Sequence, residues 1–274
     1  MITGALRAWD VVWQGCAAYA ASGATVVERD RIRWFATGVG YEGLNGVFVA
    51  PGTPAVPVED ATRTFHDLRV PALWHIASVG VSAGPAEPAA SLPGLSWYEE
   101  EPLMTAPIGR YEPPHVDGLS VFAVRDEPGI REWVRIWSGQ DSGRVFQGLV
   151  AARAAVGAGF VHLVAVLAGD TVGCAAVFLG TEGAELQHVV TVPTARRRGV
   201  GTAIVIAALR IAAARGLDTA VLTSSPDGVR IYQRLGFRPV GRIRRYLWTP
   251  PPPKSPSRSL DRMAPETSTG RRTM

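Results

Sequence analysis

Cysteine and excess charge are both scarce in this sequence. It has only two cysteines among 274 residues, Cys16 and Cys174. Two cysteines cannot form the disulfide framework of a small secreted protein, and neither lies in a metal-binding spacing, so we expect no metal. The 28 Lys and Arg are nearly balanced by 24 Asp and Glu, which leaves a formal net charge of +4. Five of these basic residues and only two acidic ones fall in residues 250–274. The rest of the chain therefore offers no basic stripe, and we expect no nucleic-acid partner.

Long apolar runs and targeting signals are also missing. The longest apolar helix candidate, Val200–Ala214, is interrupted by Thr202 and Arg210, and it is shorter than the roughly 20 residues of a membrane span. Residues 1–21 are apolar but broken by charged and polar side chains, so they lack the core of a signal peptide. We therefore expect a cytoplasmic protein with no membrane partner.

The composition is that of a folded chain, with 47% hydrophobic and 19% charged residues. Two stretches rich in proline divide it. Prolines and glycines cluster in residues 107–118 and predict a surface linker, because proline removes backbone donors and restricts the residue before it. Residues 250–274 begin with four prolines and continue in Ser, Pro, Arg and Thr, which predicts a disordered tail. The expected domains are therefore 1–106 and 119–249.

Apolar spacing predicts a regular series of elements after the linker. We expect strands over Leu119–Arg125, Val161–Leu167, Val172–Leu179, Glu185–Val192 and Thr219–Thr223 and a strand pair across Phe237–Trp248, with helices over Ile130–Trp137, Val145–Val156, about Gly199 to Arg215 and through Tyr232. This order predicts an α+β mixed sheet flanked by helices, with Glu185–Val192 parallel to Thr219–Thr223. Residues 1–106 predict a smaller α+β domain, with a first helix around Leu6–Cys16, strands within Arg31–Thr37 and Gly46–Val49, a helix within Ala61–Gly80 and a strand from Ser96.

The most informative segment joins the strand that ends at Val192 to the apolar helix after Gly199. It reads Arg196-x-x-Gly199-x-Gly201. Helix N-termini present unpaired N–H groups and a partial positive charge, and glycines let an anion approach them. The turn therefore predicts a cradle for a diphosphate. It lacks the Gly-Lys-Ser/Thr of a Walker loop and the third glycine of the dinucleotide fingerprint.

This segment resembles the signature Arg/Gln-x-x-Gly-x-Gly/Ala of the GNAT superfamily of acetyl-CoA-dependent N-acetyltransferases. A second segment, Ser225-x-x-Gly228-x-x-x-Tyr232-x-x-x-Gly236-Phe237, looks like the later Asn-x-x-Ala-x-x-x-Tyr-x-x-x-Gly-Phe segment of the same family. The resemblance covers residues 119–249 and implies a GNAT-like fold with acetyl-CoA as co-substrate.

The resemblance also implies roles for individual residues. Strands that diverge after Val190 would hold the thioester, and Tyr232 would return a proton to the leaving thiolate, unless it is simply a core tyrosine. The residues implied to bind acetyl-CoA are Val190, Thr191 and Val192 at the pantetheine arm, Arg197, Arg198, Gly199, Val200, Gly201 and Thr202 at the pyrophosphate, and Ser225 at a pantetheine amide. Two departures stand out: Ser225 replaces an asparagine, and Ala220 occupies a position where some relatives carry a carboxylate base.

Glu185 is the best replacement base, because it lies eleven residues before Arg196, where several relatives place a catalytic Glu or His. A partly buried carboxylate has a raised pKa and can accept a proton from an ammonium; the alternative is an exposed strand-end charge. His188 is the second candidate. Strand alternation puts it on the opposite face from Glu185 unless the strand contains a bulge. A further possibility is that no single base is required.

Residues 1–106 resemble the first, degenerate domain of tandem GNAT proteins, through Arg31–Gly40 and Leu44–Phe48. That resemblance implies a role in shaping acceptor specificity. Glu99-Glu100-Glu101 could attract a cationic amine, although such a charge run is typical of a solvated face. Together these features predict an acyltransferase that acetylates a primary amine of a small molecule by direct attack in a ternary complex, as a monomer or homodimer. The alternatives are a protein or peptide N-acetyltransferase and a non-catalytic acyl-CoA-binding sensor.

Overall fold

The structure, a computed structural model, describes residues 2–19, 25–29, 31–51, 53, 59–79, 94–139 and 159–252. Its strands form one mixed sheet of eleven, in the order β1-β2-β3-β4-β11-β5-β10-β9-β8-β7-β6. In the first half of the chain the strands are β1 (Thr25–Arg29), β2 (Ile32–Ala36), β3 (Asn45–Val49), β4 (Ala72–Val79) and β5 (Leu95–Pro107). In the second half they are β6 (Leu119–Val124), β7 (Phe160–Leu167), β8 (Asp170–Leu179), β9 (Ala184–Thr191), β10 (Thr219–Thr223) and β11 (Arg238–Trp248).

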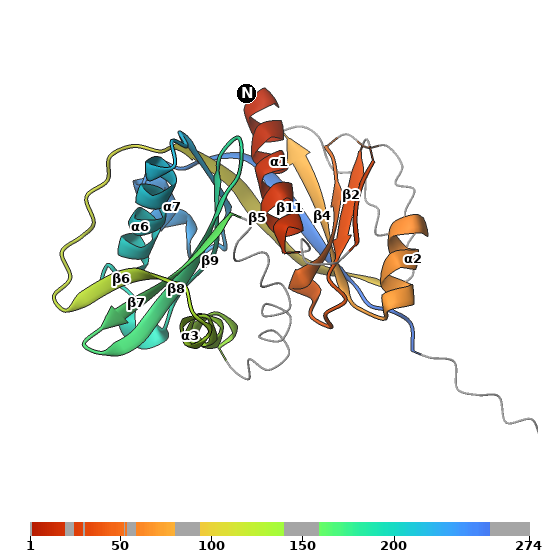
Figure 1. The fold of residues 1–274 in the computed structure, drawn as a ribbon. Coiled ribbons are helices and arrows are strands. Elements are labelled where there is room, and N and C mark those ends of the chain that lie inside the picture. Colours follow the sequence, from red (N-terminus) through yellow and green to blue (C-terminus); the bar gives the residue numbers. More distant parts are fainter. Residues whose placement is uncertain are drawn as a thin grey trace, which may run out of the picture.

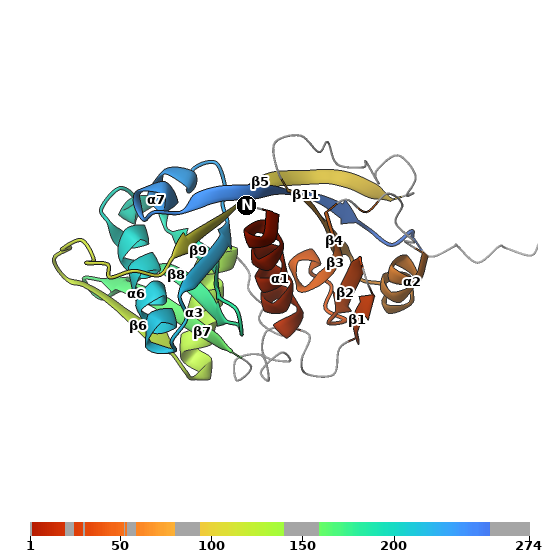
Figure 2. The same ribbon diagram turned by 90° about the horizontal axis from the view of Figure 1, so that it is seen from above.

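Two strands are exchanged between the halves of the molecule. The last strand of the first half, β5, pairs with β10 of the second half, and the last strand of the second half, β11, pairs with β4 of the first. These two strands also pair with each other over most of their length and run side by side across the molecule (Figure 2). Residues 1–106 and 119–249 therefore share one continuous sheet, so their boundary in the sequence is not a boundary in the sheet.

Helices cover both faces of this sheet (Figure 1). They are α1 (Ile2–Ala18), α2 (Glu59–Leu68), α3 (Glu127–Ser138), α6 (Val200–Ala214) and α7 (Val229–Arg234), with short 3-10 turns η1 (Glu42–Leu44) and η3 (Pro193–Ala195). Helix α3 begins at an N-cap, Asp126, whose carboxylate accepts a hydrogen bond from the Gly129 amide at 3.0 Å, and its C-cap is Gly139 with φ 70°. Both residue types are favoured at those positions, since they satisfy or accommodate the ends of a helix.

Each helix packs its apolar side on a different part of the sheet. Helix α3 buries Trp133 and Val134 against β7 and β8 on one face. Helices α6 and α7 bury an apolar cluster on the other face. Because α6 has few charged side chains that need solvent, it has buried residues on nearly all of its sides. Helix α1 lies between the two halves and packs Trp9, Val12 and Trp13 against the exchanged region of the sheet. It thereby covers the side of the sheet next to the gap described below.

The sequence predicted the fold class correctly: an α+β mixed sheet flanked by helices. The hairpin of β7 and β8 and the parallel pairing of β9 with β10 are confirmed. The strand pair expected across Phe237–Trp248 is wrong, because Arg238–Trp248 is one continuous strand between β4 and β5. The predicted helix Val145–Val156 and nearly all of the predicted disordered tail lie outside the described residues. Within the described residues, no helix is long and apolar enough to cross a membrane.

Candidate active site

A gap in the sheet opens beyond the carboxyl end of β10. Strands β9 and β10 pair only at Ala184 with Ala220 and at Glu185 with Val221, so they part after Glu185 and not, as expected, after Val190. On the other side, β10 ends where Thr223 pairs with Leu103, while β5 continues along β11 as far as Leu95. The gap is therefore bounded by β9 and β5. Ligands bind at such positions in many sheets, because the strand ends leave room and backbone groups there.

The edge of β9 that faces the gap carries backbone groups for hydrogen bonding. The Val192 amide donates to the Val172 carbonyl at 2.9 Å. Because successive amides of a strand point to opposite edges, the amide of Thr191 points towards the gap. The Arg196 guanidinium donates to the Thr191 carbonyl oxygen at 3.1 Å and ties the following turn to this strand end. Val190, Thr191 and Val192 thus sit where a linear amide-bearing ligand could pair with a strand edge.

The turn between β9 and α6 has the shape of an anion cradle. Arg197 and Gly199 both have positive φ, 61° and 86°, and Gly199 is the N-cap of α6 without a side-chain cap. The first amides of α6, at Val200, Gly201 and Thr202, have no partner within the helix. A Cβ at Gly199 would lie 3.2 Å from atoms of both Pro114 and Val116, and one at Gly201 would lie 3.3 Å from the Thr191 hydroxyl.

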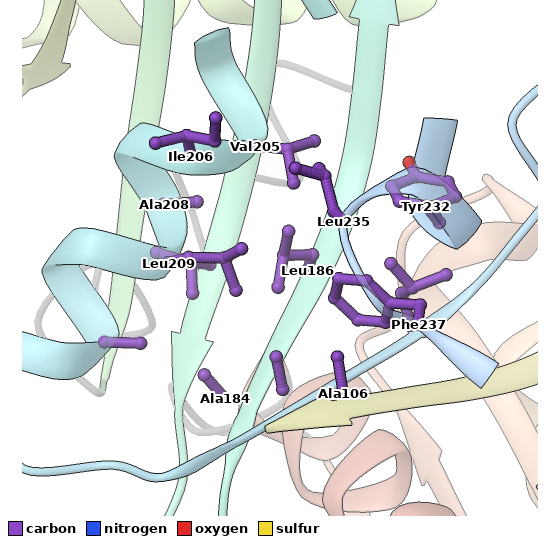
Figure 3. Close-up of a cluster of buried hydrophobic side chains, with 14 of the residues drawn as sticks. Ala106, Ala184, Leu186, Val205, Ile206, Ala208, Leu209, Tyr232, Leu235 and Phe237 are labelled. Carbon is purple, nitrogen blue, oxygen red and sulfur yellow. The ribbon is translucent and has the colours of Figure 1, made fainter. Parts of the chain in front are cut away.

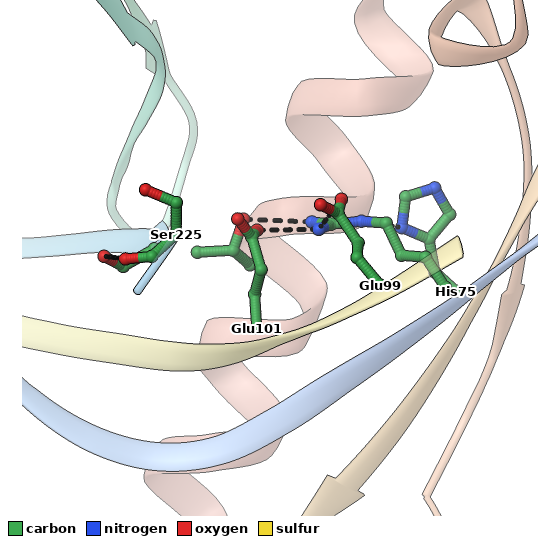
Figure 4. A network of polar contacts seen from close by, with 7 residues as sticks. His75, Glu99, Glu101 and Ser225 are labelled. Carbon is green, nitrogen blue, oxygen red and sulfur yellow. Dashed lines mark hydrogen bonds and ion pairs between the residues drawn. The ribbon is translucent and has the colours of Figure 1, made fainter. Parts of the chain in front are cut away.

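Three further predicted donor-binding residues border the same region. Arg198 and Arg197 are exposed beside the turn, where their charges would face an anion. Ser225 is exposed just after β10, at the end of the gap where Glu101 lies (Figure 4). The structure therefore places Val190–Val192 and the Gly199 turn on the β9 side of the gap and Ser225 just after the end of β10.

Tyr232 reaches the gap from helix α7. Its ring packs in the apolar cluster with Leu186, Leu235 and Phe237, and its oxygen points away from them (Figure 3). The side chain is only 8% exposed, and its hydroxyl has no hydrogen-bond partner among the described residues. Burial, and then the charge of Glu101, raise the pKa of this phenol above its ordinary value. Tyr232 is therefore a proton donor that keeps its proton until a strong base forms next to it.

An arginine from β11 forms the centre of a polar network at the gap (Figure 4). The Arg245 side chain, 10% exposed, donates from Nη1 to Glu99 at 2.8 Å and to Glu101 at 2.7 Å. It also donates from Nη2 to the Thr223 hydroxyl at 2.9 Å and from Nε to Nδ1 of His75 at 3.1 Å. The sequence analysis missed Arg245 and Thr223 altogether, because nothing in the sequence shows that β11 lies beside β5.

Glu185 is buried beneath helix α1 and is not an exposed strand-end charge. It is 4% exposed, and Gln187 Nε2 donates to its Oε2 at 2.6 Å. A Cβ at Gly15 of α1 would collide with the carboxylate, so a glycine is needed at this point of the helix. Burial raises the Glu185 pKa to about 8, although the Gln187 hydrogen bond and the charge of Arg245 oppose the rise. At neutral pH this carboxyl therefore holds its proton most of the time.

His188 lies in a bulge of β9. Its φ is 53°, and two residues of β9 oppose Ala175 alone on β8, because Ala176 pairs with Gln187 and Cys174 with Val190. The bulge turns His188 to the same face as Glu185. The ring packs 4.2 Å from Trp137 between ring centroids, and burial lowers its pKa to about 3. His188 is thus a neutral imidazole in an aromatic wall.

The first half of the chain adds an aromatic side chain to this wall. Tyr41 meets Trp137 edge-on, with ring centroids 5.7 Å apart. The buried amide of Asn45 holds the loop before it, because Asn45 Nδ2 donates to the carbonyls of Val39 at 2.8 Å and Tyr41 at 3.0 Å. Trp97, by contrast, packs against Tyr246 on the other face of the sheet. Asn45 is therefore a structural residue, and Tyr41 belongs to the same aromatic wall as His188.

Comparisons with known proteins agree with this geometry. Residues 158–239 match the family model described as an acetyltransferase (GNAT) domain. A comparison with curated protein sequences gives no match. Among solved structures, a GCN5-related N-acetyltransferase from Kribbella flavida is 20% identical with a TM-score of 0.63, covering 90% of this chain and 96% of its own.

Two further solved structures are similar over most of the chain. A GCN5-related N-acetyltransferase from Sphaerobacter thermophilus is 17% identical with a TM-score of 0.55, covering 82% of this chain and 76% of its own. A tandem GNAT protein from the clavulanic acid biosynthesis pathway is 15% identical with a TM-score of 0.55, covering 81% of this chain and 79% of its own. At these identities the likeness is one of fold.

Proposed function

Because residues 158–239 belong to the GNAT acetyltransferase family, we propose that the protein transfers the acetyl group of acetyl-CoA directly to the primary amine of a small molecule. The observation that carries this proposal is the hydroxyl of Tyr232: the residue is only 8% exposed, yet its oxygen points away from the apolar cluster and has no hydrogen-bond partner among the described residues. In the same proposal the protein acts in the cytoplasm as a monomer or homodimer.

The residues at the gap fit acetyl-CoA as a co-substrate. The free amides of Val200, Gly201 and Thr202 at the start of α6, with the exposed charges of Arg197 and Arg198, suit a pyrophosphate. The gap-facing edge of β9 suits the amides of the pantetheine arm, as an added strand would. The contacts at Gly199 and Gly201 explain why neither position has a side chain. Within the described residues, no group of His, Cys, Asp and Glu side chains could hold a metal ion.

The proposed reaction is a direct attack of the amine nitrogen on the thioester carbonyl carbon. A carbon–nitrogen bond forms, the carbon–sulfur bond breaks, and the electron pair stays on sulfur. Tyr232 donates its proton to this thiolate, which a phenol with a raised pKa can do only as the thiolate develops. The nitrogen loses a proton in exchange, and the Tyr232 phenolate recovers one from solvent. Strand amides of β9 would stabilise the oxyanion that forms at the carbonyl.

Glu185 is a better candidate than His188 for accepting the proton of the amine. Glu185 accepts a proton only in its ionised form, which is a minor fraction at neutral pH, but with a pKa of about 8 that form is a much stronger base than the neutral imidazole of His188, whose pKa is about 3. Because α1 covers Glu185 at Gly15, the proton would reach it through water and not by contact with the acceptor.

The test combines a binding and a turnover measurement on the same sample. Acetyl-CoA binding is measured by calorimetry, and thiol release is then measured against a panel of small amines. Tyr232→Phe should lower kcat by about 100-fold or more while the dissociation constant for acetyl-CoA stays unchanged. Tyr111→Phe is the matched control, because the Tyr111 hydroxyl bonds only to the carbonyls of Pro107 and Leu235 within the described part of the chain. Absence of acetyl-CoA binding would refute the proposal.

A peptide or protein amine is the second candidate acceptor. The edge of β5 before Leu103 faces the gap without a strand partner among the described residues, and an extended peptide could pair with it. Thiol release with peptides but not with small amines would favour this alternative. If the protein binds acetyl-CoA but releases no thiol with any acceptor, and Tyr232→Phe binds acetyl-CoA as tightly as the wild type, the result would instead indicate a sensor.

A further inference from the structure

The three consecutive glutamates of β5, Glu99–Glu101, lie on opposite faces of the sheet. Glu100 points to one face, where Arg242 and Arg244 each donate to it at 2.6 Å. Glu99 and Glu101 point to the other face, where they share Arg245. Because side chains of a strand alternate, the run is not a single solvated face. Two of its three carboxylates are turned towards the gap.

The two gap-facing carboxylates carry more negative charge than their partner neutralises. Nη1 of Arg245 donates to one oxygen of Glu99 and to one oxygen of Glu101. The second oxygen of each carboxylate has no hydrogen-bond partner among the described residues. One guanidinium against two carboxylates leaves a net negative site. The Glu99 side chain is 41% exposed, whereas that of Glu101 is only 14% exposed, so a second cation is favoured most strongly beside Glu101.

A second observation points to the same place from the other side of the gap. The Tyr232 hydroxyl, in a side chain that is 8% exposed, is unpartnered and close enough to Glu101 for that carboxylate to raise the pKa of the phenol. A group held by Glu101 would therefore sit next to the proposed acid. The Glu101 side chain is only 14% exposed, so it is packed into the wall of the gap and does not extend into solvent.

An aromatic ring, that of Tyr98, also lies near these carboxylates. Tyr98 is an extra residue in a bulge of β5, since Arg245 pairs with Glu99 and Tyr246 with Trp97. The bulge leaves the Tyr98 ring 43% exposed and near Glu99 and Glu101. Aromatic rings beside carboxylates stabilise organic cations.

We propose, on the basis of the proposed function, that Glu101, with Glu99 beside it, binds the acceptor by its ammonium group, so that the acceptors are cationic amines that carry no carboxylate. A carboxylate on the acceptor would meet a site that is already negative, and a second amine would be favoured there. The strand that supplies Glu101 belongs to the first half of the chain, so this half sets the acceptor class.

Three four-carbon probes test the charge rule: 1-aminobutane, 1,4-diaminobutane and 4-aminobutanoate. They differ only in the group at the far end, which is neutral, positive or negative. We expect kcat/KM to be highest for the diamine, lower for the monoamine and at least 10-fold lower again for the amino acid. A preference for 4-aminobutanoate would overturn the inference.

Three matched variants test the residues: Glu101→Gln, Glu99→Gln and, as the control on the opposite face, Glu100→Gln. Loss of a charged hydrogen-bond partner should raise KM for 1-aminobutane by about 10- to 100-fold in Glu101→Gln, by less in Glu99→Gln, and within twofold in Glu100→Gln. The acetyl-CoA dissociation constant should stay unchanged in all three. Equal KM values in Glu101→Gln and Glu100→Gln would overturn the inference.

The controls separate this inference from the proposed function. Thermal unfolding of each variant shows whether it is folded, and Glu101→Asp, which keeps the charge, should recover part of the affinity. Amine binding is also measured by calorimetry without acetyl-CoA. If the wild type releases no thiol but binds 1,4-diaminobutane through Glu101, only the proposed function fails. If it acetylates amines and Glu101→Gln changes nothing, only the inference fails.

Discussion

Replacement of Glu185 by glutamine should make the protein more stable, and increasingly so as the pH rises. The folded-state pKa of about 8 lies above the ordinary value of 4.5. The folded protein therefore binds this proton more tightly than the unfolded chain does. The stability present below pH 4.5 is lost progressively up to pH 8, at about 1.4 kcal/mol per pH unit. The full loss is about 5 kcal/mol, and Glu185→Gln, which cannot ionise, should escape it.

The assay is urea unfolding of the wild type and of Glu185→Gln at pH 5, 6, 7 and 8. The difference in free energy of unfolding between the two proteins should grow steadily across this range and level off above pH 8. Gln187→Ala serves as a companion variant: it removes the hydrogen bond that lowers the Glu185 pKa, so the loss of stability should continue to higher pH than in the wild type and reach a larger total. Parallel curves for the wild type and Glu185→Gln would refute the assignment of a buried, protonated carboxyl under α1.

Two further substitutions test the turn and the network. Gly199→Ala should lower the free energy of unfolding by about 1–2 kcal/mol, because residue 199 has a positive φ, and it should weaken acetyl-CoA binding in calorimetry, because the new Cβ would crowd Pro114 and Val116. Gly4→Ala is the control: a Cβ there meets nothing within 4 Å, so its effect on stability should be neutral or stabilising. Equal effects of the two substitutions would contradict the reasoning. Arg245→Met should lower the free energy of unfolding by about 3–5 kcal/mol in urea at pH 7, because it leaves the charges of Glu99 and Glu101 without a partner. This loss of stability should become smaller in acid, where the two carboxylates are protonated. A loss below about 1 kcal/mol would show that the network is no more than a surface ion pair.

The sequence predicted the second half of the chain well because its signals are local. The hairpin of β7 and β8, the helix α6 and the turn at Gly199 each follow from spacing within a few residues. The strands, the helix and the turn on the β9 side of the gap could therefore be predicted from the sequence. The positions of Tyr232 and the Gly199 turn at one gap agree with that prediction, and their catalytic and binding roles stay predictions until activity is measured.

The β5 side of the gap could not be predicted, because its structure depends on which strands are neighbours in the sheet. Nothing within the run around Glu101 shows that β5 lies between β10 and β11, or that Arg245 faces it. The bulges at His188 and Tyr98 change which face those side chains take. A single extra residue reverses the alternation that sequence reasoning relies on. The sequence therefore favours a solvated face for Glu101 and its neighbours over attraction of a cationic amine.

The exchange of β5 and β11 also determines when the molecule can be completed during synthesis. Strand β11 ends at Trp248, yet it pairs with β4, whose last residue is Val79. Until Trp248 has left the ribosome, the exposed edge of β4 and one edge of β5 wait for a partner that has not yet been made. Domains usually fold in the order in which they are synthesised. Here the first half is closed by β11, so the nascent chain must keep two open edges from pairing elsewhere until Trp248 has been synthesised.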